Sequence, residues 1–170
     1  EVRRPEDLAG MSIRTLGSDM HNRTFELLGM KAHSMRLDEA KIAIANNEVD
    51  AQENPFANTT TYGIHLAHKF HTLSNHFYLS RGIYVNPQKF ASWPEDIRAA
   101  TIATIPDAVA HQRELAVSEE LIARAEIEDA GGIVHELTPE EHEAFASAVT
   151  PIYSEARVRF GDQMFSMVGR

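Results

Sequence analysis

One arginine and one short polar motif carry the side chains best suited to recognising a small acid. Arg14 stands in the run Met-Ser-Ile-Arg-Thr (residues 11–15), and the motif Ala-Gln-Glu-Asn-Pro occupies residues 51–55. Each lies where a strand-like run gives way to a turn and a helix, and in parallel α/β sheets ligands bind at those junctions. A guanidinium offers a planar fork of donors that suits a carboxylate, and the Asn54 amide can donate from the side. The two features together predict a carboxylate-binding cleft.

Both features also have ordinary structural explanations. An arginine at a strand end is more often part of a surface ion pair, and most such pairs contribute little to stability. Asn54 precedes Pro55, and asparagine starts turns while the residue before a proline is pushed out of the helical region. A turn role for Asn54 is compatible with a ligand role.

Histidines form a second concentration of reactive side chains, at positions His65, His68, His71 and His76. Two of them, His65 and His68, would share one helix face. No HExxH motif and no cysteine supplies a third committed metal ligand. We therefore expect neither a metal nor a cofactor. A metal-dependent hydrolase that uses this cluster remains one alternative function, and an effector-sensing module of similar α/β architecture remains another.

The composition describes an acidic globular protein. The 170 residues are 43% hydrophobic and 24% charged, and 16 basic against 25 acidic residues give a formal net charge of −9. That balance argues against nucleic acid or an anionic membrane surface as a partner. The sequence contains no apolar run long enough to span a bilayer, so we expect no direct membrane insertion. The absence of cysteine excludes disulfides.

Alternating strand and helix patterns place the two polar features. We predict strand 11–16, helix 18–29, strand 32–37, helix 38–46 and strand 49–51. Alternation at this spacing implies parallel strands joined by right-handed crossovers, which is the doubly wound α/β arrangement. Arg14 and Asn54 would then lie at the same edge of one sheet.

The remainder of the chain is predicted to be mostly helical. We expect a helical stretch 55–67, strands 70–73 and 77–85, a short helix from Asn86, a long helix 92–129, strand 133–137 and a helix from 138 to about 160. Capping boxes are predicted to start the long helix at Ser92 and the last helix at Thr138. Pro106 lies inside the long helix. Because helical periodicity resumes after it, we predict a bend there and not a chain reversal.

Five segments, in this order and spacing, resemble the dicarboxylate-type solute-binding proteins of TRAP transporters. They are Pro-Glu-Asp-Leu-Ala-Gly (5–10), Met-Ser-Ile-Arg (11–14), Val-Asp-Ala-Gln-Glu-Asn-Pro (49–55), Leu-Ser-Asn-His (73–76) and Glu-Leu-Thr-Pro-Glu-Glu (136–141). The resemblance covers nearly the whole chain. It implies a non-catalytic periplasmic receptor whose two α/β lobes close on a small organic carboxylate and deliver it to the membrane subunits of a TRAP transporter.

The resemblance also implies a division of the chain, which would correspond to the C-terminal half of the family's usual length. Residues 1–78 would form the α/β core of the second lobe, with the periplasmic-binding-protein-like fold. Residues 79–119 would return to a first lobe that is mostly absent here. Residues 120–170 would complete the long bridging helix and pack the C-terminal elements on the second lobe.

The resemblance assigns roles to five residues. Arg14 matches the arginine that pairs with the ligand carboxylate, and Asn54 matches an asparagine that hydrogen-bonds the ligand. Glu53 and His76 match positions that hold that arginine in place. Leu37 falls where several members place an aromatic residue that stacks on the ligand. The leucine at this position leaves the identity of the acid open.

Overall fold

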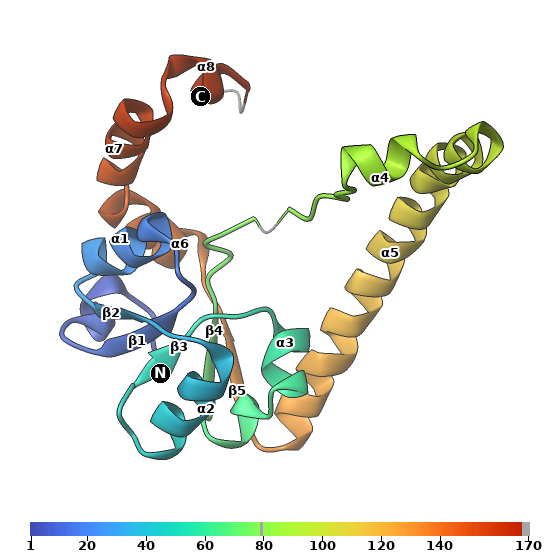
Figure 1. The fold of residues 1–170 in the computed structure, drawn as a ribbon. Coiled ribbons are helices and arrows are strands. Elements are labelled where there is room, and N and C mark those ends of the chain that lie inside the picture. Colours follow the sequence, from blue (N-terminus) through green and yellow to red (C-terminus); the bar gives the residue numbers. More distant parts are fainter. Residues whose placement is uncertain (79, 168–170) are drawn as a thin grey trace.

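The computed structural model describes residues 1–78 and 80–167, and it builds the first half of the chain around a parallel sheet (Figure 1). The elements, in chain order, are η1 (Pro5–Leu8), β1 (Ser12–Thr15), α1 (Asp19–Leu27), β2 (Lys31–Ser34), α2 (Leu37–Ala45), β3 (Ala51–Gln52), α3 (Phe56–Thr61), η2 (Ile64–Leu66), β4 (Phe70–Leu73), α4 (Pro87–Ala91), α5 (Glu95–Asp129), β5 (Ile133–Glu136), α6 (Pro139–Ala148), α7 (Pro151–Phe160) and α8 (Asp162–Met167).

The first sheet has the strand order β2-β1-β3, and both pairings are parallel. The chain leaves β1 through α1 to pair on one side and returns through α2 to pair on the other, so strand order reverses at β1. This confirms the predicted strand–helix–strand–helix–strand unit. In such sheets the crevice at the carboxyl ends beside the reversal point is where ligands bind.

Local sequence explains why β1 is the central strand. Ile13, Arg14 and Thr15 are all buried, as expected for a strand covered on both faces. The Ser18 side chain accepts a hydrogen bond from the His21 N–H and thereby caps α1. Gly29 adopts a left-handed conformation with φ 81°, which ends the helix and turns the chain into β2.

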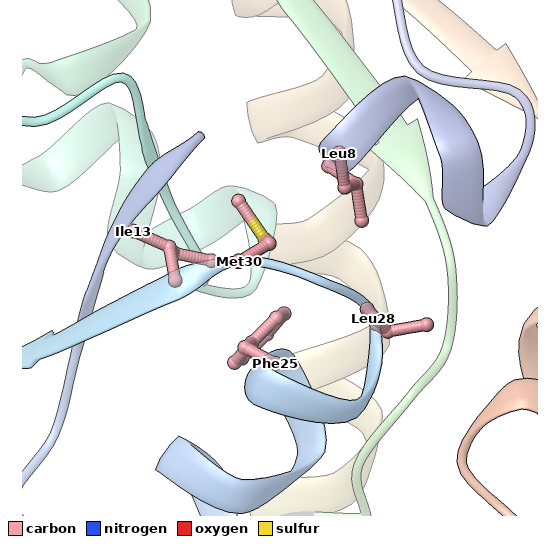
Figure 2. Packing of buried hydrophobic residues seen from close by; sticks show 5 residues of the cluster. All are labelled: Leu8, Ile13, Phe25, Leu28 and Met30. Atoms are coloured by element: carbon pink, nitrogen blue, oxygen red, sulfur yellow. The ribbon is translucent and has the colours of Figure 1, made fainter. Parts of the chain in front are cut away.

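A hydrophobic cluster fixes α1 and η1 against this sheet (Figure 2). Its buried members are Leu8 from η1, Ile13 from β1, Phe25 from α1, and Leu28 and Met30 from the turn that follows. Burial of side chains of this size stabilises by about 1.5–3 kcal/mol each relative to exposure. The cluster therefore holds the central strand, and Arg14 with it, in place.

A second, two-stranded parallel sheet joins β4 to β5, and the C-terminal end of α5 packs beside it. Ala123 and Ile127 of α5 are buried, and Ile127 has no exposed surface. Gly132 begins the turn into β5 directly against Ile127. The base of α5 is thus built into the lobe.

Helix α5 runs without interruption through Pro106, so the chain does not reverse there, as predicted. Figure 1 shows the first turns of the helix nearly end-on while the rest runs across the view, so its axis changes direction near the N-terminal end. Proline lacks the donor and clashes with the preceding turn, which is the usual cause of a kink.

The predicted strand 77–85 is wrong. Residues 77, 78 and 80–85 form no strand, and residue 79 lies outside the described residues. Tyr78 and Tyr84 are 90% and 92% exposed. Aromatic and β-branched residues favour strands because they pack on a pleated, half-buried surface. No described strand lies beside this segment to provide such a surface.

Several boundaries also differ from the predictions. Ser92 closes α4 and does not cap α5, whose N-cap is Pro94. Strand β2 ends at Ser34, so Leu37 belongs to α2. The single C-terminal helix expected after Thr138 is divided into α6 and α7, because Pro151 cannot donate the hydrogen bond that would continue α6. The capping box at Thr138 is confirmed.

The contact between Gly132 and Ile127 makes a testable prediction about the base of α5. A Cβ atom on Gly132 would lie 2.6 Å from Ile127 Cγ2 and 2.7 Å from the Ile127 carbonyl oxygen. Gly132→Ala should therefore lower the free energy of unfolding by about 1–3 kcal/mol, as overpacking does. At Gly17 an added Cβ would meet nothing within 4 Å, so Gly17→Ala should change stability by no more than about 0.5 kcal/mol. Urea unfolding measures both, and equal stabilities would contradict this packing.

Candidate functional site

Arg14 is the third residue of the central strand and is only 3% exposed. Its Nε and Nη2 groups donate to the Met35 carbonyl oxygen at 3.1 and 3.0 Å. Met35 follows β2 and donates its own N–H to the Thr15 carbonyl oxygen at 3.3 Å. The backbone after β2 therefore orients the guanidinium. Among the described residues, Nη1 has no hydrogen-bond partner.

No carboxylate of the described residues lies within 4 Å of the Arg14 guanidinium. By contrast, Arg23 pairs with Glu155 at 2.8 Å, and Arg159 pairs with Asp19 at 2.9 Å. Those two arginines are about half-exposed, so water solvates their charge as well. Arg14 combines a buried charge with the lack of an anionic partner within the described chain, which is the condition that an anionic ligand would relieve.

Asn54 follows β3, the strand that pairs with β1 at Arg14. Arg14 is opposite Gln52, the last residue of β3. The Asn54 amide donates to Gln52 Oε1 and accepts from the Asn58 amide at 3.3 Å. Gln52 in turn donates to the Thr59 hydroxyl at 3.4 Å. A continuous chain of side-chain hydrogen bonds thus joins the loop after β3 to helix α3.

Glu53 and His76 are brought together, with 3.6 Å between Glu53 Oε2 and His76 Nε2. The Ser74 hydroxyl lies 2.7 Å from His76 Nδ1, and the His76 ring meets the Phe25 ring edge-on at 5.3 Å between centroids. Neither Glu53 nor His76 forms an ion pair or hydrogen bond with Arg14 in the described chain. Their expected role in holding Arg14 therefore stays a prediction.

The Met35 carbonyl, which does hold Arg14, was not predicted. A backbone acceptor has no side-chain signature, so its only trace in the sequence is its place just after a strand next to β1. Leu37, the predicted stacking position, is the first residue of α2 and is half-buried, two residues beyond Met35. Its contact with a ligand also stays a prediction.

A hollow of about 380 Å³ lies away from these residues, between α1 and α7. It is lined by Asp19, Met20, Asn22, Arg23, Glu26, Glu155 and Arg159. Its arginines are already paired with carboxylates. The chemistry of an acid site is therefore better met at Arg14 than in this hollow.

Three of the four histidines lie in or between η2 and β4, whereas His76 follows β4 and lies beside Glu53 and Phe25. His65 Nε2 is 3.8 Å from Glu126 Oε1, and the His71 ring meets Phe56 edge-on at 6.4 Å. Burial lowers the pKa of His68, against an opposing effect of Asp50. Burial also lowers the pKa of His71, against a hydrogen bond to the His68 backbone that raises it, and the charges of His68 and His65 lower it further.

The cluster does not assemble a metal site. Within residues 1–78 and 80–167, no group of three or more histidine, cysteine, aspartate or glutamate side chains is arranged to hold a metal ion. The same part of the chain contains no helix with the length and apolar character needed to cross a membrane.

The first sheet is parallel and its strand order reverses at the central strand, which is an α/β arrangement in which ligands bind at the carboxyl ends of the strands. The chain belongs to family 7 of the bacterial extracellular solute-binding proteins, the DctP family, which matches residues 1–158. This confirms the family that the sequence segments indicated.

Curated relatives support this membership. The C4-dicarboxylate-binding periplasmic protein DctP of Rhodobacter capsulatus is 30% identical over 165 residues, which are 96% of this chain and 50% of that protein. The 2,3-diketo-L-gulonate-binding periplasmic protein YiaO of Escherichia coli is 26% identical over 148 residues, 87% of this chain and 44% of that protein. The chain spans about half the length of the curated relatives it matches.

Solved structures show the same fold. The TRAP periplasmic solute-binding protein of Chromohalobacter salexigens, with bound D-glucuronate, superposes with a TM-score of 0.92 at 23% identity, over 99% of this chain and 55% of that chain. The corresponding protein of Ralstonia eutropha, with bound (S)-2-acetolactate, has a TM-score of 0.81 at 29% identity, over 98% of this chain and 55% of that one. The α/β fold class predicted from the sequence is confirmed.

The lowered pKa values of His68 and His71 predict how stability depends on pH. Both pKa values lie below the ordinary 6.5 in the folded protein, so the unfolded chain binds more protons as the pH falls through that value. The stabilisation is therefore complete above about pH 6.5 and is lost as the pH falls below it. Urea unfolding between pH 7.5 and 5.5 should show a falling free energy of unfolding, and His71→Gln should flatten that slope.

His111 provides a matched control, because it is exposed on α5. His111→Gln should show the same slope of unfolding free energy against pH as the parent protein. If the free energy of unfolding falls with pH equally steeply in the parent and in His71→Gln, the buried imidazoles do not cause the pH dependence.

Proposed function

We propose that the chain is the ligand-binding lobe of a periplasmic, non-catalytic receptor that delivers a small organic carboxylate to the membrane subunits of a TRAP-type transporter. The observation that carries the proposal is the Arg14 guanidinium, buried at the reversal point of the sheet without a carboxylate partner in the described chain. The carboxylate of the ligand would supply the missing counter-charge.

The energetics favour this assignment. An unpaired buried charge costs several kcal/mol, and a hydrogen bond to one neutral carbonyl oxygen offsets only part of that cost. The Met35 carbonyl fixes two of the three guanidinium nitrogens, so the arginine is oriented before any ligand arrives. A pre-oriented group loses less conformational entropy on binding.

The ligands of the related proteins support the chemical class. The relatives are described as binding C4-dicarboxylates and 2,3-diketo-L-gulonate, and the solved structures hold D-glucuronate, (S)-2-acetolactate, L-malate and succinate. These molecules differ in size and in hydroxyl content but share a carboxylate. Arg14 is suited to recognise that shared group.

We propose that a second lobe completes the site. Residues 1–78 would form the core of the described lobe, and residues 79–119 would pack against the other lobe. Residues 120–170 would return to the lobe that residues 1–78 form. The exposed apolar side chains between 78 and 119 support this division, and they include Tyr78, Ile83, Tyr84, Val85, Ile97, Ile102, Leu115 and Val117. Asn54, Leu37, Glu53 and His76 would complete this lobe's share of the site.

The geometry of Arg14 predicts that a positive charge alone at this position will not bind the acid as tightly as the arginine does. Arg14→Lys keeps the charge but cannot form the two-bond fork, so in the full-length receptor it should weaken binding of the acid by about 1.5–3 kcal/mol, the usual worth of a charge-assisted hydrogen bond. Calorimetric titration with succinate, L-malate and D-glucuronate measures this. The control Arg3→Lys changes an exposed arginine that pairs with Glu1 and should bind as the parent does. Unchanged affinity in Arg14→Lys would rule out the carboxylate clamp.

Enclosure by two lobes makes a separate prediction. A cleft receptor buries most of its ligand between two walls, so the 170-residue chain alone should bind the same acids far more weakly than the full-length receptor does. Titration of both proteins in one buffer tests this. Low-micromolar binding by the 170-residue chain would show that this lobe forms a complete site.

A further inference from the structure

Helix α3 begins immediately after the proposed ligand residue Asn54, and the residue at its N-cap position cannot cap it. That residue is Pro55, and no side-chain hydrogen bond caps the helix from there. The N–H groups in the first turn of any helix have no partner within the helix and need an acceptor from elsewhere. The first such groups in α3 belong to Phe56 and Ala57.

Glu120 of α5 supplies that acceptor across more than sixty residues of sequence. Its Oε2 accepts from the Phe56 N–H at 3.0 Å, and its Oε1 accepts from the Ala57 N–H at 3.3 Å. A carboxylate in this position also lies at the positive end of the helix dipole. One side chain therefore joins the long helix to the start of α3.

The hydrogen bonds within α3 carry this attachment to the ligand residue. Asn58, on the first turn of α3, donates its amide to Asn54 Oδ1. Thr59, on the same helix, accepts from Gln52, which accepts from Asn54. A displacement of α3 would therefore displace the Asn54 amide.

Glu120 lies next to the part of α5 that packs on the lobe. Glu120, Ala123 and Ile127 share one face of the helix, and the last two are buried. The neighbouring Glu119 is exposed, and its side chain forms no hydrogen bond or ion pair with the described residues. The contact to α3 is thus specific to one of two adjacent glutamates.

We propose that Glu120 is a positioning residue of the acid site, which fixes the Asn54 amide relative to the long helix α5. The inference rests on the proposed function, in which Asn54 contacts the acid, and it adds a residue outside the set formed by Arg14, Leu37, Glu53, Asn54 and His76. A change in the direction of α5 is transmitted through Glu120 to the ligand amide.

The test compares Glu120→Gln with Glu119→Gln in the full-length protein. Glutamine has nearly the same shape but replaces one acceptor oxygen by a donor, so it can serve only one of the two N–H groups. In the absence of ligand, hydrogen exchange at the Phe56 and Ala57 amides should be about tenfold faster in Glu120→Gln, and the Asn54 side-chain amide signal should shift. Glu119→Gln should match the parent in both measurements.

Binding of succinate, L-malate and D-glucuronate then separates a positioning role from a general loss of stability. Glu120→Gln should lower the affinity for the acid that the parent binds best by about tenfold. In an Asn54→Ala background the same change should have no further effect on affinity, because Glu120 acts through Asn54. Glu120→Asp retains both acceptor oxygens and should restore part of the affinity even if Glu120→Gln lowers the yield of folded protein.

Two results would overturn the inference. One is equal exchange at Phe56 and Ala57 in Glu120→Gln and Glu119→Gln. The other is an affinity loss that persists undiminished in the Asn54→Ala background. If the parent binds none of the three acids, it is the proposed function that fails, and the exchange rates and the Asn54 signal still decide whether Glu120 holds the loop.

Discussion

A buried guanidinium without a counter-charge in the described chain is the constraint around which this lobe is built. Arg14 lies in a strand that is covered on both faces, so its charge is largely removed from water. The sheet can accommodate it because the chain after β2 turns the Met35 carbonyl toward Nε and Nη2. The hydrophobic cluster around Ile13 and Phe25 in turn holds the strand in position. Apolar packing therefore holds the strand that carries Arg14, whose charge has no carboxylate partner in the described chain.

Local signals were sufficient to predict the parts of the fold whose partners lie close in sequence. Ser18 and Gly29 bound α1, and the capping box at Thr138 starts α6, as predicted. The strand 77–85 could not be judged in the same way, because strand-forming residues become a strand only beside another strand. The start of α5 was misplaced for a related reason: Ser92 is a good capping residue for either of two helix ends, and only the three-dimensional arrangement decides between them.

The residues of the candidate site also differ in whether local sequence could predict them. Arg14 and Asn54 could be singled out because their side chains carry the relevant chemistry and each lies near the end of a predicted strand. The Met35 carbonyl and Glu120 could not. Every residue has a carbonyl, and Glu120 lies in a run of acidic and apolar residues that reads as a solvated helix face. Its attachment to Phe56 and Ala57 spans more than sixty residues, which no local pattern encodes.

The base of α5 shows how a long, mostly exposed helix can still act on the site. Ile127 is completely buried and Gly132 closes tightly on it, so this end is fixed by packing that costs several kcal/mol to disrupt. The ion pair of Arg124 with Glu136 of β5 is partly exposed and adds little by comparison. Toward its N-terminal end the helix extends away from both sheets (Figure 1), and it continues through Pro106 without interruption. Glu120 lies about one turn before the buried Ala123, and its carboxylate accepts from the Phe56 and Ala57 N–H groups at the start of α3. The long helix is therefore joined to the segment after Asn54 close to where it packs on the lobe.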